Sequence, residues 1–373
     1  MALATESAWP AEAPLEGIAI TRYGHGVQTR RIRVVEAGHP IPDTAGEDAA
    51  GEIAARVREL GKNDLLLALL SGGGSSLLSM PAAGISMADL KAVTGQLLRS
   101  GASIQEMNTV RKHLSAIHGG RLAAATRARV LALIVSDVTG DDPTHIASGP
   151  CAPDPTTYAN AREILGRYGI DAPVSVARRL AAEADETPKP GDPVFERVEN
   201  RVIATAHGSL EAAAEVFRGA GIAPVILGDT VTGEASEVAK VMAALVREIR
   251  RSGAPFRPPV ALISGGECTV TVRGESGRGG RCSEFLLSLA LELEGVDGVH
   301  ALAADTDGID GSEDNAGAWM DPGTLARARA SGADPVKALA ANDSYGVFSA
   351  AGALVATGPT LTNVNDYRVI LIT

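Results

Sequence analysis

Short apolar runs alternate with longer stretches of helical composition over most of this chain. The runs end at Gly, Ser or Asp, which is typical of short strands buried on both faces of a parallel sheet. Because strands and helices alternate, we predict an α/β fold whose functional residues lie at the carboxyl ends of the strands. The predicted strands are 65–70, 130–135, 202–206, 224–227, 260–264, 300–304 and 368–372.

The stretches between these runs have the spacing or the alanine-rich composition of helices. Ser86 and Asp89 have the spacing of a capping box, which predicts that a helix begins directly after Ser86. The predicted helices are 47–60, 87–100, 105–125, 174–185, 209–219, 233–252 and 283–294.

The length and one irregular segment indicate two domains. A chain of 373 residues favours about two domains. The segment 186–199 is rich in proline and charged residues, which indicates a linker. We therefore predict two α/β domains, over 1–195 and 200–373.

Charge and cysteine content exclude several classes of protein. The chain carries 34 Lys and Arg against 45 Asp and Glu, and a net charge of −11 disfavours a partner such as nucleic acid or an anionic membrane. Cys151, Cys268 and Cys282 are far apart, so neither a disulfide framework nor a zinc ribbon is expected. No apolar run is long enough to span a membrane and no secretory leader is present, so we expect a cytoplasmic protein.

Two glycine-rich turns follow predicted strands. In the first, glycines let the backbone turn tightly and present N–H groups to an anion, while serines add hydroxyl donors. The second repeats this pattern after the strand 260–264. Each could equally be a tight turn that only the backbone requires. The candidate phosphate- or carboxylate-binding residues are Ser71, Gly72, Gly73, Gly74, Ser75, Gly265, Gly266 and Glu267.

Two clusters of basic residues could hold an anion. Arg278 and Arg281 lie on a glycine-rich loop that opens a helix, which suits a polyanion such as a triphosphate. Arg111 and Lys112 lie close to Asn108 on one face of a predicted helix, where they could hold a carboxylate or a phosphate. The alternative for both clusters is a solvated basic surface.

Acidic and amide residues form the remaining candidates. Asp137 follows one predicted strand and Asp305 and Asp307 follow another, and such carboxylates suit Mg²⁺ or serve as turn residues. Polar segments with Asn342, Asp343 and Asn365 suit either hydroxyl recognition or plain turns. The 7 histidines are scattered, without a metal-binding spacing, and are expected to be ordinary surface or hydrogen-bonded core residues.

The order of these motifs resembles the class II glycerate kinase family, the ATP-dependent glycerate 2-kinases with a leucine-rich MOFRL C-terminal domain. The resemblance covers residues 17–373 and rests on an ordered set of nine segments. These are HPIPD (39–43), SGGGSS (71–76), NTVRKHLSAIHGGRL (108–122), SDVTGDDPTHIASGP (136–150), ISGGE (263–267), RGGR (278–281), ADTDGIDG (304–311), NDSYG (342–346) and TGPTLTNVND (357–366).

The resemblance implies two α/β/α three-layer domains with the active site in the cleft between them. One would be Rossmann-like with a mainly parallel sheet, and the other would have a smaller mixed sheet. The implied reaction transfers the ATP γ-phosphoryl group to the 2-hydroxyl of D-glycerate with Mg²⁺. Arg281, with Arg278, would stabilise the transferring group, and Asp137, Asp305 and Asp307 would be Mg²⁺ ligands or, in one case, a base. Whether the protein forms a homo-oligomer is left open.

Two departures from the family pattern leave alternatives open. A Gly-Lys-Ala segment that the family carries upstream has no counterpart, so we expect its first strand and its lysine to be absent. Cys282 and Ser283 stand where the family usually has Asn-Gln. The alternatives are a truncated, nucleotide-binding relative with impaired activity, and an NAD(P)H-dependent hydroxypyruvate reductase. The reductase label occurs on some relatives, but this chain has no dinucleotide fingerprint to support it.

Overall fold

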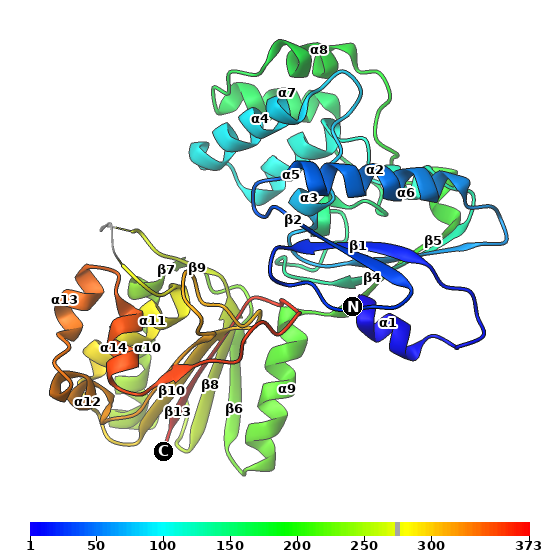
Figure 1. The fold of residues 1–373 in the computed structure, drawn as a ribbon. Coiled ribbons are helices and arrows are strands. Elements are labelled where there is room, and N and C mark those ends of the chain that lie inside the picture. The colour runs from blue at the N-terminus through cyan, green and yellow to red at the C-terminus, as the bar shows by residue number, and fades with distance from the viewer. Residues whose placement is uncertain (273–276) are drawn as a thin grey trace. The chain divides into compact units, whose positions relative to one another are not determined.

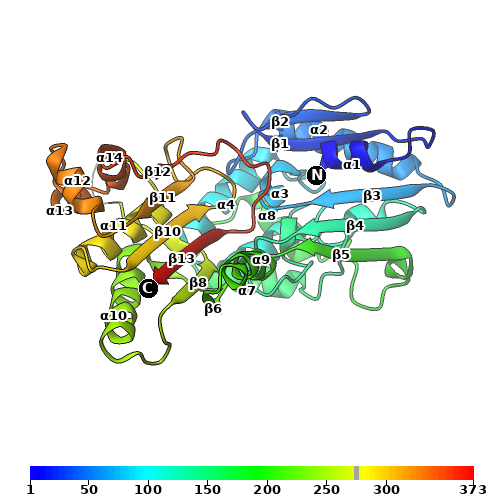
Figure 2. The ribbon, with the colours of Figure 1, turned by 90° about the horizontal axis from the view of Figure 1, so that it is seen from below.

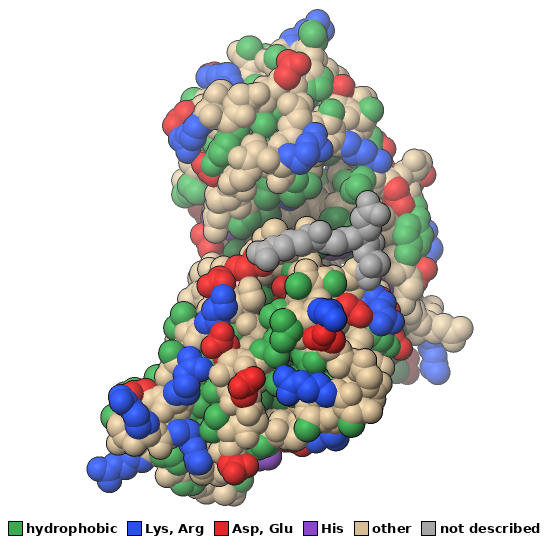
Figure 3. Space-filling view, turned by 90° about the vertical axis from the view of Figure 1, so that its left-hand side faces the viewer, with side chains coloured by type: hydrophobic (Ala, Val, Ile, Leu, Met, Phe, Trp, Pro, Cys, Tyr) green, Lys and Arg blue, Asp and Glu red, His purple; other side chains and the backbone are tan. Residues whose placement is uncertain are grey.

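The computed structural model describes residues 1–272 and 277–373. These residues form two compact units, Met1–Ile203 and Ala204–Thr373, each built from both strands and helices (Figure 1). The α/β class predicted from the sequence is confirmed. Within the described ranges, no helix is long and apolar enough to cross a membrane. Basic and acidic side chains are interspersed on the face drawn in Figure 3.

The first unit contains two small sheets. In one, β1 and β2 are parallel neighbours, and in the other β4 lies between β3 and β5 (Figure 2). β3 and β4 are parallel, with Leu65 opposite Arg129 and Leu70 opposite Ile134, so their carboxyl ends lie at the same edge. The strands are β1 (Gly17–Arg22), β2 (Ile32–Ala37), β3 (Leu65–Leu70), β4 (Arg129–Val135) and β5 (Val198–Ala204), whose last residue begins the second unit.

Helices of the first unit form two apolar cores. One core joins α4, α5, α7 and α8 around Leu97, Leu114 and Tyr158. The other packs α2 and α6 on one face of β3 and β4, while the alternate side chains of β3, including Leu65, are exposed or only partly buried. The helices are α1 (Ala2–Ala8), α2 (Thr44–Glu59), α3 (Gly74–Leu77), α4 (Met87–Ser100), α5 (Ile104–His113), α6 (Arg121–Ala124), α7 (Tyr158–Arg167) and α8 (Val174–Ala182), with the 3-10 helices η1 (Ile146–Ser148) and η2 (Pro193–Arg197).

Two local predictions for this unit have different outcomes. The capping box of Ser86 and Asp89 is present and α4 begins directly after it, as predicted. The helix predicted over 105–125 is instead two helices, since α5 ends at His113 and α6 begins at Arg121. Between them, Gly119 and Gly120 adopt φ values of +61° and +82°, which a continuous right-handed helix does not allow.

The second unit is built on a six-stranded sheet in the order β12-β11-β10-β13-β8-β6. β13 is antiparallel to both β10 and β8, and within this sheet only β8 and β6 are parallel. The strands are β6 (Ala223–Gly228), β7 (Gly233–Glu234), β8 (Val260–Gly266), β9 (Cys268–Thr269), β10 (Val299–Asp305), β11 (Gly317–Met320), β12 (Leu354–Val355) and β13 (Asp366–Ile372).

Helices cover both faces of this sheet. α10 and α11 pack on the face that presents Val260 and Leu262, and α9 packs on the opposite face with Ala261 and Ile263 (Figure 1). The mixed sheet predicted for this half is confirmed, although it is the largest sheet of the chain and not a smaller one. The helices are α9 (Ala206–Gly219), α10 (Ala235–Ser252), α11 (Arg281–Leu293), α12 (Thr324–Ala330), α13 (Pro335–Ala340) and α14 (Ser344–Ala350).

The segment 186–199 is packed against the first unit instead of forming a free linker. Thr187 is buried, and its hydroxyl donates to Oδ2 of Asp154 at 3.0 Å. Lys189 Nζ lies 2.7 Å from Thr187 Oγ1. Among the charges that suggested a linker, Lys189 is paired with Glu186 within the unit.

Candidate functional site

Close packing explains the three glycines of the SGGGSS turn, which follows β3. A Cβ atom on Gly72 would lie 2.0 Å from Oδ2 of Asp137, and one on Gly73 would lie 3.0 Å from the imidazole of His39. Gly73 also has a φ of +77°, which favours glycine. The turn therefore brings Asp137, from the end of β4, and His39, from the segment after β2, to one place.

A chain of hydrogen bonds connects this turn to α5. The Ser75 and Ser148 hydroxyl oxygens are 2.8 Å apart, and Ser148 donates to Oδ1 of Asn108 at 3.1 Å. Arg111 Nη1 donates to the same oxygen at 3.4 Å. Ser148 has a φ of +56°, a conformation that is costly for a serine and is often kept for function. The sequence suggested Ser75 on one motif and Asn108 with Arg111 on another, and the structure brings the two motifs together through Ser148, which was missed.

Arg111 and Lys112 do not form one cationic surface, which corrects the sequence interpretation. Arg111 is partly buried and makes no salt bridge within the described part of the chain, and burial lowers its pKa. Lys112 is 1% exposed, and its Nζ lies 3.3 Å from Oδ1 of the fully buried Asp154. Lys112 is therefore an internal ion-pair partner, whereas Arg111 lines the pocket beside the turn.

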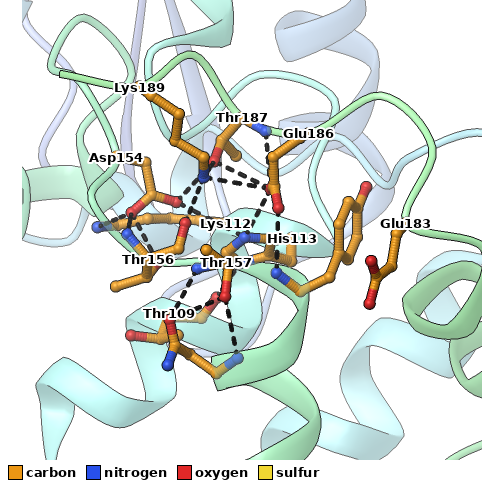
Figure 4. Close-up of polar contacts among 12 residues, drawn as sticks. Thr109, Lys112, His113, Asp154, Thr156, Thr157, Glu183, Glu186, Thr187 and Lys189 are labelled. Carbon is orange, nitrogen blue, oxygen red and sulfur yellow. Dashed lines mark hydrogen bonds and ion pairs between the residues drawn. The ribbon is translucent and has the colours of Figure 1, made fainter. Parts of the chain in front are cut away.

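Asp154 and Lys112 belong to one network of polar contacts (Figure 4). Burial alone would raise the pKa of Asp154, but Lys112 and hydrogen bonds from Thr156 hold it below its usual value. In the same network, His113 Nε2 lies 3.0 Å from Oε1 of Glu186. These contacts tie α5 to the segment that begins at Glu186, so the network holds the unit together.

Arg281, at the start of α11 in the second unit, contacts three carboxylates. Its Nε donates to Asp366 at 2.8 Å, its Nη2 donates to Asp305 at 2.7 Å, and its Nη1 lies 3.0 Å from Glu267. Burial alone would lower the pKa of Arg281, but these carboxylates raise it. These contacts fix the orientation of the guanidinium group. The spacing of the residues along the sequence did not predict any of the three contacts.

A second buried arginine, Arg368, supports this cluster. Its Nη1 lies 3.3 Å from Asp366 Oδ2, and its Nη2 donates to the carbonyl oxygen of Gly265 at 2.6 Å. Sequence reasoning missed both Asp366 and Arg368, although opposite charges two positions apart at the start of an apolar strand were a usable signal.

The second glycine-rich turn is not an open loop. β8 continues through Gly265 and Gly266, which pair with Tyr367 and Asp366 of β13. A Cβ atom on Gly266 would lie 2.4 Å from backbone atoms of Val231. These glycines are strand residues selected by close packing, which corrects their assignment to an anion-binding loop.

The amino end of α11 is occupied by a carboxylate of the protein itself. Asp310 is fully buried and accepts hydrogen bonds from the backbone of Cys282 and Ser283 at 2.9 and 2.8 Å, and from the Ser283 hydroxyl at 2.6 Å. Such a cap uses the N–H groups and the positive dipole end that were expected to bind a triphosphate. The residues that replace the family's Asn-Gln are therefore parts of a cap, with the Cys282 side chain in the core.

The remaining polar candidates of this unit hold loops together. Arg278 donates to Asp343 at 3.2 Å and lies over the Tyr345 ring, with its side chain half exposed. Asp343 also caps α14, and Asn342 Nδ2 donates to Glu284 at 2.9 Å. The backbone oxygen of Asn365 accepts hydrogen bonds from Thr306, on the loop that carries Asp305 and Asp307.

Asp305 and Asp307 do not form a complete metal site with other described side chains. Among residues 1–272 and 277–373, no three His, Cys, Asp or Glu side chains form a group that could hold a metal ion. Burial raises the pKa of Asp305 to about 7, and Asp307 and Asp366 add to the increase while Arg281 opposes it. Mg²⁺ is often held by one or two carboxylates together with substrate phosphates. The pair therefore fits an ion that arrives with its substrate.

Comparison with known families and proteins gives a consistent result. Residues 1–181 match the family model described as a domain of unknown function, DUF4147, and residues 260–366 match the MOFRL family. The chain is 53% identical to an Agrobacterium vitis protein that carries the provisional name hydroxypyruvate reductase, with 100% of this chain and 84% of that protein covered. It is 42% identical to the glycerate 2-kinase of Pyrococcus horikoshii, with 96% and 82% covered.

A solved structure extends the similarity to three dimensions. The crystal structure of the glycerate kinase of Thermotoga maritima matches with a TM-score of 0.87 and 41% identity. The match covers 96% of this chain and 85% of that one, so it includes most of both units described above.

Proposed function

The chain belongs to the glycerate 2-kinase family, and we propose that it transfers the γ-phosphoryl group of ATP to the 2-hydroxyl of D-glycerate. The products would be 2-phosphoglycerate and ADP. The observation that carries the proposal is the 42% identity to a glycerate 2-kinase over 96% of this chain. The orientation of Arg281 by three carboxylates gives that proposal a chemical basis.

Phosphoryl transfer needs positioning and neutralisation of charge more than covalent chemistry from the protein. Arg281 would place a fixed positive charge beside the transferring group, with Asp366 and Glu267 maintaining its orientation. Arg278 is half exposed and would add a second guanidinium group. Asp305 and Asp307 would hold Mg²⁺, which when bound neutralises phosphate charge.

The first unit would contribute the substrate-positioning groups. The Ser75 hydroxyl and the backbone of the SGGGSS turn suit hydrogen bonds to oxygen atoms of a small acid. Asp137, packed against Gly72, is our candidate for accepting the proton of the attacking hydroxyl.

The decisive experiment incubates the purified protein with ATP, Mg²⁺ and D-glycerate and identifies the product by ³¹P and ¹³C NMR. We expect phosphorus coupling at carbon 2, and an Arg281→Met protein should give no product. Absence of 2-phosphoglycerate from the unaltered protein would overturn the proposal.

The name of the Agrobacterium vitis relative, 53% identical to this chain, makes hydroxypyruvate reduction the second candidate. The same preparation should therefore be mixed with hydroxypyruvate and NADH or NADPH. A substrate-dependent loss of absorbance at 340 nm would favour the reductase, and we expect none.

A further inference from the structure

A small pocket lies beside the SGGGSS turn in the first unit. It has a volume of about 20 Å³, and Ser75, Ser76, Ser115, Arg111 and His118 are among the residues that line it. This volume holds about one water molecule. The pocket can therefore take one polar end of a ligand, while the rest of the ligand stays outside.

Arg111, together with Lys91, gives this pocket a positive charge. Its guanidinium group is partly buried, and its hydrogen bond to the Asn108 amide oxygen is long, at 3.4 Å. No salt bridge to Arg111 is formed in the part of the chain that the structure describes. A partly buried arginine that lacks a carboxylate partner is unfavourable by itself, and an incoming carboxylate would relieve that cost.

His118 gives the pocket a hydrogen-bond acceptor. The side chain is 2% exposed, and its Nε2 has no hydrogen-bond partner among the described residues. The ring also contacts the backbone of Gly74 and Leu78, which leaves that contact to Nδ1. Because Nδ1 then carries the ring proton, the unpartnered Nε2 presents a lone pair.

We propose that this pocket recognises a small 2- or 3-hydroxy acid, with Arg111 binding the carboxylate and His118 Nε2 accepting a hydrogen bond from a hydroxyl group. The inference rests on the proposed function, because D-glycerate is the hydroxy acid it assigns. The hydroxyl donor distinguishes such an acid from a dianionic phosphate group, which has no proton to donate to His118.

His118 is a binding residue here and not the base of the reaction. Burial, with Arg111 and Lys112 nearby, lowers its pKa to about 3, so the ring is uncharged near neutral pH and takes up no second proton there. Lys112 cannot replace Arg111 at the pocket, because its ammonium group is paired with Asp154.

The test measures D-glycerate and ADP binding by isothermal titration in the presence of Mg²⁺. Arg111→Met should raise the Kd for D-glycerate at least about thirtyfold, and Arg111→Lys less, because lysine keeps the charge but loses the bidentate geometry. His118→Leu should raise it about tenfold, whereas His118→Gln, whose amide oxygen can accept a hydrogen bond, should raise it less than about threefold. The Kd for ADP should stay within about twofold, and Arg58→Met, at an exposed arginine of α2, is the matched control.

Thermal unfolding checks that each variant is folded. If His118→Leu does not fold, the comparison uses His118→Gln, Arg111→Met and Arg111→Lys. D-Lactate carries only the 2-hydroxyl and 3-hydroxypropionate only the 3-hydroxyl, so they show which hydroxyl is recognised. The analogue with the recognised hydroxyl should bind His118→Leu more weakly than the unaltered protein, whereas the affinity for propionate, which has neither hydroxyl, should not change. The inference is overturned if folded Arg111→Met binds D-glycerate as the unaltered protein does, or if neither analogue responds to His118→Leu. It is also overturned if the unaltered protein binds no D-glycerate. If D-glycerate binds through Arg111 but no 2-phosphoglycerate forms, the proposed function fails and this inference stands.

Discussion

Arg281 Nε and Asp366 Oδ1 are 2.8 Å apart, which joins the first residue of α11 to the first residue of β13. Asp366 is fully buried and also contacts Arg368 at 3.3 Å. The charge that would meet the phosphates is thus oriented by a carboxylate that is itself held by a second arginine.

We expect Arg281→Lys to lower kcat by about 10³-fold, because an ammonium group cannot contact Asp366, Asp305 and Glu267 in one geometry. Steady-state kinetics with D-glycerate and ATP would measure the loss. Arg247→Lys, at a half-exposed pair with Glu292, is the control and should change kcat by less than about twofold. Equal effects of the two substitutions would contradict this role of Arg281.

Replacing the cap of α11 should affect stability. Asp310→Ala removes three hydrogen bonds to Cys282 and Ser283 and should lower the free energy of unfolding by about 2 kcal/mol. Urea unfolding would measure the change. Asp334→Ala, at the exposed cap of α13, should cost about 1 kcal/mol or less. If Asp310→Ala lowers the free energy of unfolding no more than Asp334→Ala does, the buried cap contributes no more to stability than an exposed one.

The sequence predicted β8 well because burial on both faces leaves a continuous apolar run, and it predicted β3 from a similar run although one face of β3 is exposed or only partly buried. It did not predict the antiparallel direction of β13, since helices cover both faces of the sheet and direction then leaves no trace in the pattern. β1, β2 and the short β11 and β12 were missed for the opposite reason, because they lack such a run.

For the candidate site, the sequence predicted which residues carry charge but not which charges are paired. Arg111 and Lys112 are adjacent in sequence, yet one helical step separates their directions by about 100°. Only the fold brings Asp154 to Lys112, and only the fold leaves Nε2 of His118 without a hydrogen-bond partner among residues 1–272 and 277–373. A histidine expected to be ordinary therefore has a buried ring nitrogen with no hydrogen-bond partner among the described residues.

His118 should make stability depend on pH. Its folded pKa of about 3 lies below the ordinary 6.5, so the unfolded chain binds a proton between these values that the folded chain does not. Stability should therefore fall as the pH falls below about 6.5. Between pH 7 and pH 5, we expect the unaltered protein to lose about 2 kcal/mol more than His118→Gln. Urea unfolding at both pH values measures this, and parallel losses would show that His118 titrates normally.

The buried pair of Lys112 and Asp154 should contribute to stability without contributing to ligand binding. Lys112→Met leaves the Asp154 carboxylate buried without its cation, which should cost about 3–5 kcal/mol. Adding Asp154→Asn should recover much of that loss, because the amide oxygen can still accept the hydrogen bond from Thr156 and the amide N–H can donate to the Thr187 hydroxyl oxygen.

A double-mutant cycle in urea measures this coupling, and Arg33→Met, at an exposed pair with Glu52, is the control that should cost less than about 1 kcal/mol. If the cycle shows no coupling, Lys112 and Asp154 contribute to the free energy of unfolding independently, which would contradict this prediction. The Kd for D-glycerate completes the comparison, because Arg111→Met should change affinity with little effect on stability, and Lys112→Met should do the reverse. Two adjacent cations would then have separate roles because, within the described part of the chain, only Lys112 has a carboxylate partner.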